Sequence, residues 1–407
     1  MKKYWLILDS YTFIWKNDVK VLVYNSLSGR GFDTCLSPVL DAVVNKILDM
    51  ANMYCVEISE KERHDDGFSN FVRLLKGYFC GDIILNDNVS RPISIYPKLN
   101  INEAIDRDYK GIDNFESFGH HVAKNLLEFT LYLNGQIGKS NFQNQILWFL
   151  SGENFLSLNN LDLLFDKIQD IRILDFNVVA KNIFEYPYLE RLYYLLQKYA
   201  FKVSFYTYYK SVCSRDNFIQ IASNERFEPF LFLDFPIEES VIEKIHSWHV
   251  AVKYVVKISS VEEYDQVLTL IDKYQLDIKI SPWFNGNNLS FFEEYVFLKK
   301  DDLLDTQWNK QEIFSHQVLN TNDFGKLSML PNGVIYANTF FDSIGGIRDN
   351  IKQLIYKELK EGKSWRRTRD TLVPCCSCLY RYVCPSPSNY ELVLEKSNMC
   401  FCVDCLD

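Results

Sequence analysis

The cysteines of this 407-residue chain are concentrated near one end: seven of the eleven lie between residues 375 and 407. They form two groups, Cys375, Cys376, Cys378 and Cys384, followed by Cys400, Cys402 and Cys405. Two thiolates separated by two residues in a turn can converge on one tetrahedral ion or one cluster. The spacing therefore predicts that this segment folds around a metal ion or an iron–sulfur cluster.

Disulfide bonds are the alternative for clustered cysteines, because they staple small secreted domains. The chain shows no secretory features: Asp9 interrupts the apolar stretch at the start, and no uncharged apolar run approaches the length of a membrane span. We therefore expect a reducing cytoplasm. The other cysteines are scattered, and we expect them to be small buried hydrophobic residues; they are Cys35, Cys55, Cys80 and Cys213.

Length and charge limit the classes of protein that fit. A chain of 407 residues suggests roughly two to four domains, and a hydrophobic content of 47% indicates packed globular units. The formal net charge of -9 argues against binding a nucleic-acid backbone, because such binding needs a net basic surface.

Residues 1–95 have the pattern of a small winged-helix-like α+β module. β-Branched and aromatic residues predict strands, and apolar residues at helical spacing predict helices. In chain order we expect the strands Tyr4–Leu8, Tyr11–Trp15 and Val19–Asn25, a turn over Ser26–Gly31, the helix Pro38–Ala51, the strand Tyr54–Ile58 and the helix Phe68–Phe79. Such folds bind DNA or peptides, and the few basic residues of Phe68–Phe79 favour peptide.

Residues 96–323 alternate strand-like runs with helical patterns. The predicted strands are Glu128–Leu133, Ile171–Val178, Phe201–Tyr206, Pro229–Asp234, Val250–Lys257 and Asp277–Ser281. The predicted helices are Leu158–Ile168, Tyr188–Tyr199, Glu238–Ser247 and Val261–Tyr274. Repeated βα units indicate an α/β fold with a parallel sheet, here an incomplete (βα)6 barrel whose active face lies at the carboxyl ends of the strands.

Residues 324–407 begin with a hairpin signal, Asn332-Gly333 between two apolar runs. We expect a turn at Gly345-Gly346 and a helix over Ile351–Leu359 before the cysteines. Arg366, Arg367 and Arg369 are expected to form a solvated face.

The hairpin followed by the cysteines resembles the SPASM extension of radical-SAM enzymes that modify peptides, which holds two auxiliary 4Fe–4S clusters. The positions that match one ligand set are Cys375, Cys378, Cys384 and Cys400. The resemblance implies one 4Fe–4S cluster there, with zinc as the alternative because four thiolates suit both. Asn338 and Ser388 stand where the other set has cysteines, which implies that the second cluster is lost.

Other metal candidates are weaker. Possible additional ligands are Cys376, Cys402 and Cys405, which leaves a second small zinc site open. His246 and His249 form an HxxH pattern without a cysteine or glutamate at ligand spacing.

The predicted barrel departs from the radical-SAM pattern, which places three cysteines after the first strand. No cysteine lies between residues 80 and 213, and the corresponding loop offers Lys139, Ser140 and Gln143. The Gly-Gly-Glu motif that would hold the cosubstrate corresponds to Ala180-Lys181-Asn182. The resemblance thus implies a retained fold without S-adenosylmethionine binding or catalysis.

As a whole, the chain is similar to the pseudo-radical-SAM/SPASM proteins of Bacteroidales gene clusters for ribosomal peptide natural products (RiPPs). Such clusters encode a precursor with a Gly-Gly-type leader and an active radical-SAM maturase, which the resemblance implies as partners, with no role for nucleic acid or a membrane. Residues 1–95 look like a PqqD-like RiPP recognition element, residues 96–323 like a degenerate barrel, and residues 324–407 like a SPASM domain.

A recognition element binds its leader as an added strand packed against a helix. We expect this edge at Val19–Asn25, beside Phe68–Phe79. The predicted peptide-binding residues are Val21, Val23, Asn25, Phe71, Leu74, Leu75 and Tyr78. The alternative is that this module only caps the barrel or dimerises.

Three functions remain open. The first is a non-catalytic accessory protein that binds a leader peptide and assists an active maturase. The second is a redox enzyme or electron-delivery protein that uses the retained cluster. The third, a DNA-binding regulator, is disfavoured by the acidic net charge.

Overall fold

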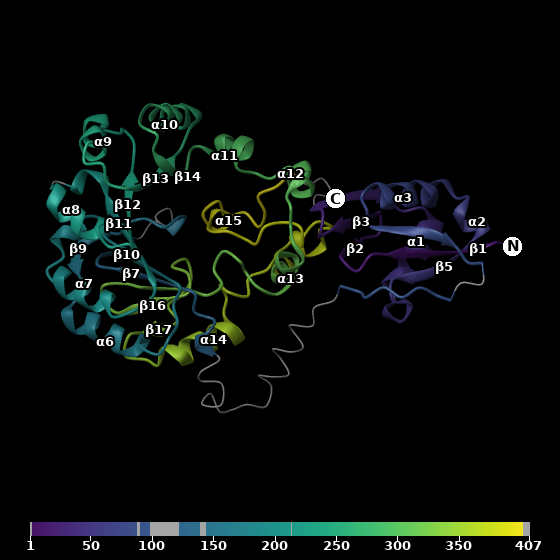
Figure 1. Ribbon diagram of the computed structural model, residues 1–407, viewed down its shortest axis with the longest axis horizontal. Helices are drawn as coiled ribbons and strands as arrows, with labels where there is room; N and C mark the ends of the chain where they lie inside the picture. Colours follow the sequence, from purple (N-terminus) through teal and green to yellow (C-terminus); the bar gives the residue numbers. More distant parts are fainter. Residues whose placement is uncertain (1, 88–89, 98–121, 139–143, 213, 402–407) are drawn as a thin grey trace.

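The computed structural model describes residues 2–87, 90–97, 122–138, 144–212 and 214–401. Figure 1 shows the N-terminal module at one end of the molecule, a large sheet with its helices at the other, and the C-terminal segment between them. The first and last parts of the chain therefore lie side by side, and they share a hydrophobic core.

The N-terminal module contains two three-stranded antiparallel sheets, in the orders β5-β1-β6 and β2-β3-β4. The strand bounds are β1 Lys3–Leu8, β2 Thr12–Lys16, β3 Lys20–Asn25, β4 Arg30–Cys35, β5 Cys55–Ser59 and β6 Gly81–Leu85. The sequence patterns predict neither β4 nor β6. β4 is missed because its first two residues belong to the stretch Ser26–Gly31, which was expected to be turn throughout.

Two helices, α1 (Pro38–Leu48) and α3 (Asp66–Gly77), form one core with strands of both sheets. The start of α1 follows from local chemistry, because Ser37 Oγ accepts a hydrogen bond from the Leu40 N–H at 3.1 Å. The apolar positions of α1 that face the core are Leu40, Val43, Val44 and Ile47, as the helical spacing predicts. The short helices η1 (Met50–Asn52) and α2 (Glu60–Arg63) complete the module.

The rest of the chain shares a nine-stranded sheet in the order β14-β13-β12-β11-β10-β7-β15-β16-β17. The bounds are β7 Glu128–Tyr132, β10 Asp175–Val179, β11 Lys202–Tyr208, β12 Phe227–Leu233, β13 Lys253–Ile258, β14 Asp277–Pro282, β15 Lys326–Met329, β16 Val334–Tyr336 and β17 Gly345–Gly346. Every neighbouring pair from β7 to β14 is parallel. The prediction of an α/β fold with a large parallel sheet is confirmed.

Helices cover one face of this sheet (Figure 1). They are α6 Leu158–Ile168, α7 Leu189–Gln197, α8 Arg215–Ala222, α9 Glu239–His246 and α10 Val261–Tyr274, of which only α8 was not predicted. On β12, Leu231 and Leu233 face the helices, whereas Phe230 and Phe232 face the opposite side. Smaller elements are β8 Asn134–Gln136, β9 Ser151–Phe155, η4 Ile183–Glu185 and η5 Tyr209–Ser211.

The predicted hairpin is present as the antiparallel pair β15–β16. Gly333 in its turn has φ +83°, a conformation that glycine adopts without steric cost. Gly345-Gly346 is not the expected turn: it forms β17, which pairs with β16. Because β15 pairs with β7, the sheet continues across the boundary predicted at residue 323, and the division into three domains stays a prediction.

The remaining helices are α11 Leu289–Tyr295, α12 Lys300–Asp305, α13 Lys310–Val318, α14 Ile351–Glu361, η6 Arg369–Thr371, η7 Cys375–Ser377 and α15 Asn389–Val393. The helix predicted over Ile351–Leu359 is α14. In residues 369–401, the described part of the segment that carries the cysteines, the helices are the short elements η6, η7 and α15, so little regular structure holds this part in place. Within the described ranges, no helix is long and apolar enough to cross a membrane.

Candidate metal centre and its surroundings

Four thiols from the C-terminal segment line one cavity. The residues around it are Cys375, Cys378, Cys384 and Cys400, with Leu303, Arg369, Tyr380, Arg381, Asn398 and Met399. The structure therefore brings together the four cysteines predicted as one ligand set. Their binding of a metal remains a prediction.

Backbone contacts place these thiols. The Cys378 N–H donates to the Cys375 carbonyl at 2.9 Å and closes the turn η7. Cys400 is placed from elsewhere in the chain, because it forms a parallel bridge with Leu298, just before α12. A local turn thus places the first two cysteines, and long-range pairing brings in the last.

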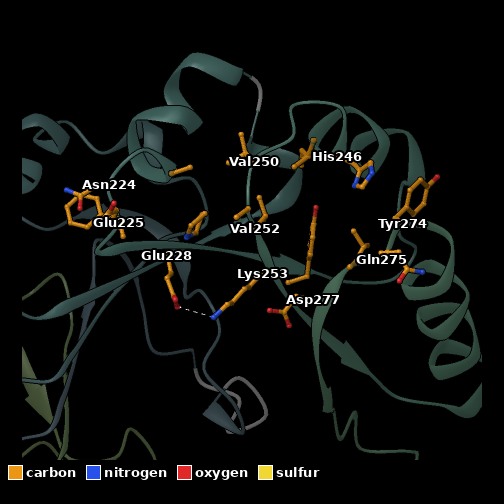
Figure 2. A pocket seen from close by; sticks show the side chains of 17 residues that line it. Asn224, Glu225, Glu228, His246, Val250, Val252, Lys253, Tyr274, Gln275 and Asp277 are labelled. Carbon is orange, nitrogen blue, oxygen red and sulfur yellow. Dashed lines mark hydrogen bonds and ion pairs between the residues drawn. The ribbon is translucent and has the colours of Figure 1, made fainter.

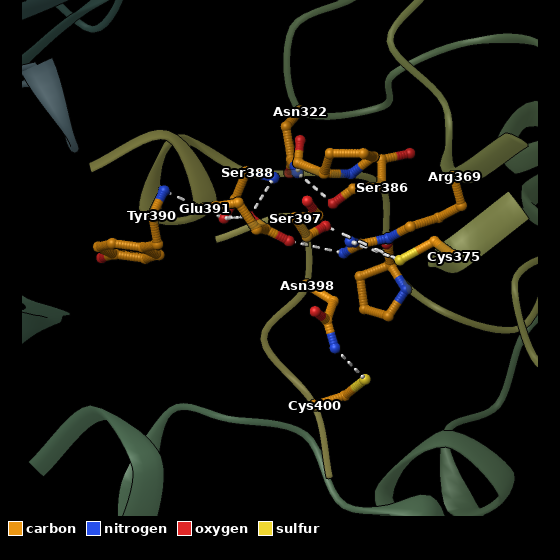
Figure 3. Close-up of polar contacts among 12 residues, drawn as sticks. Asn322, Arg369, Cys375, Ser386, Ser388, Tyr390, Glu391, Ser397, Asn398 and Cys400 are labelled. Atoms are coloured by element: carbon orange, nitrogen blue, oxygen red, sulfur yellow. Dashed lines mark hydrogen bonds and ion pairs between the residues drawn. The ribbon is translucent and has the colours of Figure 1, made fainter. Parts of the chain in front are cut away.

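Arg369 lies buried beside the thiols (Figure 3). Its guanidinium pairs with Glu391 at 2.8 Å, donates to the Pro385 carbonyl at 2.9 Å, and has Nη1 3.9 Å from Cys375 Sγ. Asn398 Nδ2 donates to Cys400 Sγ at 3.4 Å. N–H groups directed at sulfur favour thiolate over thiol. The burial of Arg369 corrects the expectation that all three arginines of this stretch form a solvated face.

The thiols stand in an environment that disfavours free thiolate. Burial raises the pKa of Cys375, and the charge of Arg369 opposes this shift in part. Burial also raises the pKa of Cys384 to about 12. Metal binding would therefore have to displace protons from these thiols. Four sulfur donors around one cavity fit zinc or an iron–sulfur cluster.

None of the other sequence candidates that the structure describes lines this cavity. Cys376 is exposed, and Cys402 and Cys405 lie outside the described residues. His246 ends α9 and lines a different cavity. Among the scattered cysteines, Cys55 and Cys80 are buried as expected, and Cys213 lies outside the described residues. Cys35 is exposed, contrary to expectation, because it is the last residue of β4, and β4 is an edge strand of its sheet.

A polar network around Asp323 lies near the cysteine cavity. The Asp323 carboxylate accepts hydrogen bonds from Asn338 Nδ2 at 3.0 and 3.1 Å, from Ser364 Oγ at 2.8 Å and from Asn320 Nδ2 at 3.1 Å. Asn338 Nδ2 also contacts Asn389 Oδ1 at 2.7 Å. Burial raises the pKa of Asp323, and the hydrogen bonds from Asn338 and Ser364 oppose this shift.

Both positions where the resemblance expects cysteines of a second cluster have other partners. Asn338 belongs to the network around Asp323. Ser388 caps α15: its hydroxyl accepts a hydrogen bond from the Tyr390 N–H at 3.3 Å and bonds to the Glu391 carboxylate. The side chains at these positions therefore hydrogen-bond to the protein itself.

Aromatic side chains fill the inner face of the large sheet near the carboxyl ends of its strands. Trp148 packs on Phe232 of β12 with ring centroids 4.4 Å apart. Lys257 of β13 lies over the rings of Trp148 and Trp283, at 4.9 and 4.8 Å. Gln145 fixes this segment through two hydrogen bonds of 2.8 Å with the Phe284 backbone. No pattern in the sequence indicates this packing, because it depends on contacts between distant segments.

Of the two segments that correspond to an S-adenosylmethionine site, the structure describes only the second. Lys139, Ser140 and Gln143 lie outside the described residues. After β10, Asn182 Oδ1 accepts a hydrogen bond from the Phe184 N–H at 3.2 Å and starts η4. Asn182 therefore serves a local structural role.

A separate cavity of about 510 Å³ lies at the amino ends of β12, β13 and β14 (Figure 2). Its acidic, basic and histidine lining residues are Glu225, Glu228, His246, Lys253 and Asp277. Glu228 and Lys253 form an ion pair at 3.3 Å. Catalytic groups of βα barrels stand at the carboxyl ends of the strands, so this cavity lies at the opposite edge.

The predicted peptide edge is on the wrong strand. β3 pairs with β2 on one side and with β4 on the other, so Val19–Asn25 has no open edge. The predicted contact residues that are buried are Val21, Val23, Asn25, Phe71 and Leu75. Asn25 Nδ2 donates to the carbonyls of Tyr78 and Phe79 at 3.1 and 2.8 Å, which is a structural role.

The edge strands of this sheet are β2 and β4, since in the described part of the chain each pairs only with β3; of the two, β4 lies beside α3. The Leu36 N–H donates to the Val19 carbonyl at 2.8 Å, just beyond the Lys20–Cys35 pair of the ladder. Because hydrogen-bonded pairs alternate in an antiparallel ladder, the Thr34 N–H points toward β3 and the Asp33 N–H points outward. Leu74 and Tyr78 of the predicted set are half-buried nearby, and Tyr78 lies 5.2 Å from the ring of Phe32 in β4.

No protein-family model matches the chain, and no curated protein matches it in sequence. In fold, it is similar to Streptococcus suis SuiB bound to the precursor peptide SuiA, with 11% identity, a TM-score of 0.47, and coverage of 99% of this chain and 100% of SuiB. It is also similar to anSMEcpe with bound AdoMet, with 10% identity, a TM-score of 0.43, and coverage of 66% of this chain and 95% of that chain. Similarities this low carry no argument about chemistry, so a function has to be argued from the residues of the chain itself.

Proposed function

We propose that this chain is a non-catalytic accessory protein of RiPP maturation, which binds a precursor leader peptide and assists an active radical-SAM maturase. The observation that carries the proposal is the free edge of β4 beside α3. An edge with open main-chain groups is a site for strand addition by a peptide. The leader-binding edge proposed here is thus β4, which replaces Val19–Asn25.

A leader added to β4 would meet two different surfaces. The outward main-chain groups of Asp33 would bond to the peptide, and alternate peptide side chains would point to opposite faces of the sheet. On one face stands α3 with Leu74 and Tyr78. On the other stands α12, where Lys300 Nζ pairs with Asp33 Oδ1 at 2.6 Å. The first face is apolar and the second is charged, which gives the site a means of selecting its peptide.

We infer that the four thiols hold one 4Fe–4S cluster with a structural role. Zinc binds thiolates at about 2.3 Å and so draws four of them close together. In the described part of the chain, no three His, Cys, Asp or Glu side chains are arranged to hold one metal ion. A cluster, whose own atoms separate its ligands, needs four thiols around one space rather than in mutual contact, and the shared cavity supplies four; zinc stays the alternative.

Sequence and packing support the absence of S-adenosylmethionine cleavage by a degenerate (βα)6 barrel. With no cysteine between residues 80 and 213, the chain lacks ligands for a catalytic cluster after β7. Trp148 and its neighbours fill the inner sheet face near the carboxyl ends. Reductive incubation with S-adenosylmethionine should give no 5′-deoxyadenosine above a protein-free control. The electron-delivery alternative has no specific support among the described residues.

Peptide binding is tested by titrating the full chain with the precursor peptide encoded beside it. Asp33→Pro removes the outward N–H and should weaken binding at least about tenfold. Asp33→Asn is the matched control, because it changes the ion pairs with Lys20 and Lys300 but keeps the N–H. Equal affinity of the Asp33→Pro and Asp33→Asn variants would exclude strand addition at β4. No binding by the unmodified chain at about 100 μM would reject the leader-binding role.

A further inference from the structure

The sheet β2-β3-β4 contacts both sites. Its strand β4 carries the proposed peptide edge, and one of its faces packs beside the cysteine cavity. Side chains of β3 alternate between its two faces. Val21 and Val23 face the helices of the N-terminal module. Leu22 and Tyr24, both fully buried, face the C-terminal segment and pack in one core with Cys378 and Cys384.

The loop between these two cysteines forms the other side of the contact. Leu379, Tyr380 and Val383 are buried in the same core as Leu22 and Tyr24. Tyr380 also lines the cysteine cavity. A change in the conformation of this loop therefore changes the surface on which β3 packs.

Polar contacts reinforce this packing. Tyr24 Oη donates to the Thr306 carbonyl at 2.8 Å and accepts from the Trp308 N–H at 2.7 Å. The ring of Trp308 lies 4.8 Å from that of His316, whose Nδ1 lies 3.0 Å from the Tyr382 carbonyl. Hydrogen bonds and ring contacts thus run from β3 to the loop that carries the thiols.

A second connection starts at β4 itself. Asp33, whose N–H points outward at the free edge, pairs with Lys300 of α12. The Lys300 ammonium also lies 5.8 Å from the ring of Tyr380. One lysine therefore contacts both the edge strand and a residue that lines the cysteine cavity.

We propose that metal loading of the four-thiol cavity is thermodynamically linked to the order of the β4 edge. This inference rests on the proposed function, because it assigns a regulator to the proposed peptide site. Residues 370–401 have little regular structure, so a bound metal would order them. An ordered loop would hold β3 and β4 in place and lower the entropy cost of strand addition by a peptide. By reciprocity, a bound peptide would raise the affinity of the cavity for its metal.

The test is hydrogen exchange of the full chain, without peptide, after anaerobic reconstitution with ferrous iron and sulfide and after metal removal. The amides of Phe32 and Thr34, which point toward β3 in the ladder, should exchange at least about tenfold more slowly in the loaded protein, within the usual range of coupling between sites. Leu22→Ala should reduce this ratio to below about twofold. Leu40→Ala is the matched control, because it also truncates a fully buried leucine of this module, but on the face away from the cysteines.

Tyr24→Phe provides a second variant if Leu22→Ala does not fold, since it keeps the ring and removes only the two hydrogen bonds of Tyr24 Oη. It should also reduce the ratio. Equal exchange of β4 with and without metal, while residues 375–400 respond, would overturn the linkage, and so would a chain that takes up no metal. Because no peptide is present, this result is independent of whether the leader binds.

Discussion

Two parts of the chain each contain a cluster of polar side chains, and the two clusters differ in where their partners come from. Around Asp323, each carboxylate oxygen accepts hydrogen bonds from donors of this chain. Around the cysteine cavity, four sulfurs surround a space, and Arg369 and Asn398 direct N–H groups at two of them. The first set is satisfied internally, whereas the donor set of the second fits an external group.

The two sets of side chains should therefore contribute to stability under different conditions. The hydrogen-bonded network around Asp323 stabilises the folded chain without a metal, and it leaves no side chain free to bind one. A cavity of thiols contributes most of its stability only when metal is bound. The stability of one region should therefore depend on its own side chains, and that of the other on metal supply.

The largest expected effect is loss of the metal centre. Cys378→Ser should abolish stoichiometric metal binding and lower the free energy of unfolding by at least about 3 kcal/mol, because metal binding is coupled to folding of this segment. Metal analysis and denaturant unfolding measure both quantities. The exposed neighbour provides the control: Cys376→Ser should leave metal content and stability unchanged. Full metal content in the Cys378→Ser protein would remove this cysteine from the ligand set.

Next comes disruption of the network. Asp323→Ala leaves the donors of Asn320, Asn338 and Ser364 without their shared acceptor and should cost about 2–4 kcal/mol, with metal content unchanged. Asp342→Ala is the control, because that side chain is 97% exposed and lies 3.9 Å from Lys363 in a surface pair. Denaturant unfolding of the metal-loaded proteins should separate the two variants. A cost below about 0.5 kcal/mol for Asp323→Ala would show that the network is not a stabilising unit.

A more direct test introduces cysteines into the region around Asp323, so that it resembles the cysteine cavity. The double variant Asn338→Cys, Ser388→Cys restores thiols at both positions expected for a second cluster. We predict unchanged iron content and a loss of about 1–3 kcal/mol, because Asp323 and Asn389 still occupy the space and lose a partner. Iron and sulfide analysis after anaerobic reconstitution is the measurement. A doubled iron content would mean that only the ligands, and not the space, are missing.

The smallest effect concerns pH. Burial raises the pKa of Asp323 above its ordinary value, so the folded chain holds this proton more tightly than the unfolded chain does. The contribution of Asp323 to stability should therefore fall as the pH rises from the ordinary pKa through the raised one. Lys326 and Arg367 oppose the raised pKa of Asp323. Burial raises the pKa of the nearby Glu358, and the charge of Asp323 adds to that shift.

Asp323→Asn removes this titration while keeping the size of the side chain. The unfolding free energy of the unmodified protein relative to this variant should decrease with rising pH in that window, by at most about 1.4 kcal/mol per pH unit. Unfolding curves at several pH values measure it. An increase with pH would mean that the hydrogen bonds from Asn338 and Ser364 outweigh burial.

Local patterns in the sequence were sufficient for many elements. The apolar spacing of Pro38–Ala51 predicted α1, and β-branched runs predicted the parallel strands, because a buried face imposes its own period on a helix or strand. Asn332-Gly333 predicted its hairpin, since the turn needs a residue with positive φ. The spacing of the cysteines, together with a resemblance, predicts the four that share a cavity.

Only the tertiary structure decided which strand has a free edge, which arginine is buried and which polar groups satisfy one another. β3 carries the alternating residues that suggested a peptide edge, but the unpredicted β4 covers it. Arg369 is buried because Glu391, 22 residues further on, pairs with its charge. Which strand lies at the edge of a sheet, and which buried polar groups become partners, depends on which distant segments meet. The periodicity of apolar residues indicates only that one face of a helix or strand is buried. The sequence therefore determined many of the elements and the set of thiols, and long-range pairing decided which strands lie at the sheet edges.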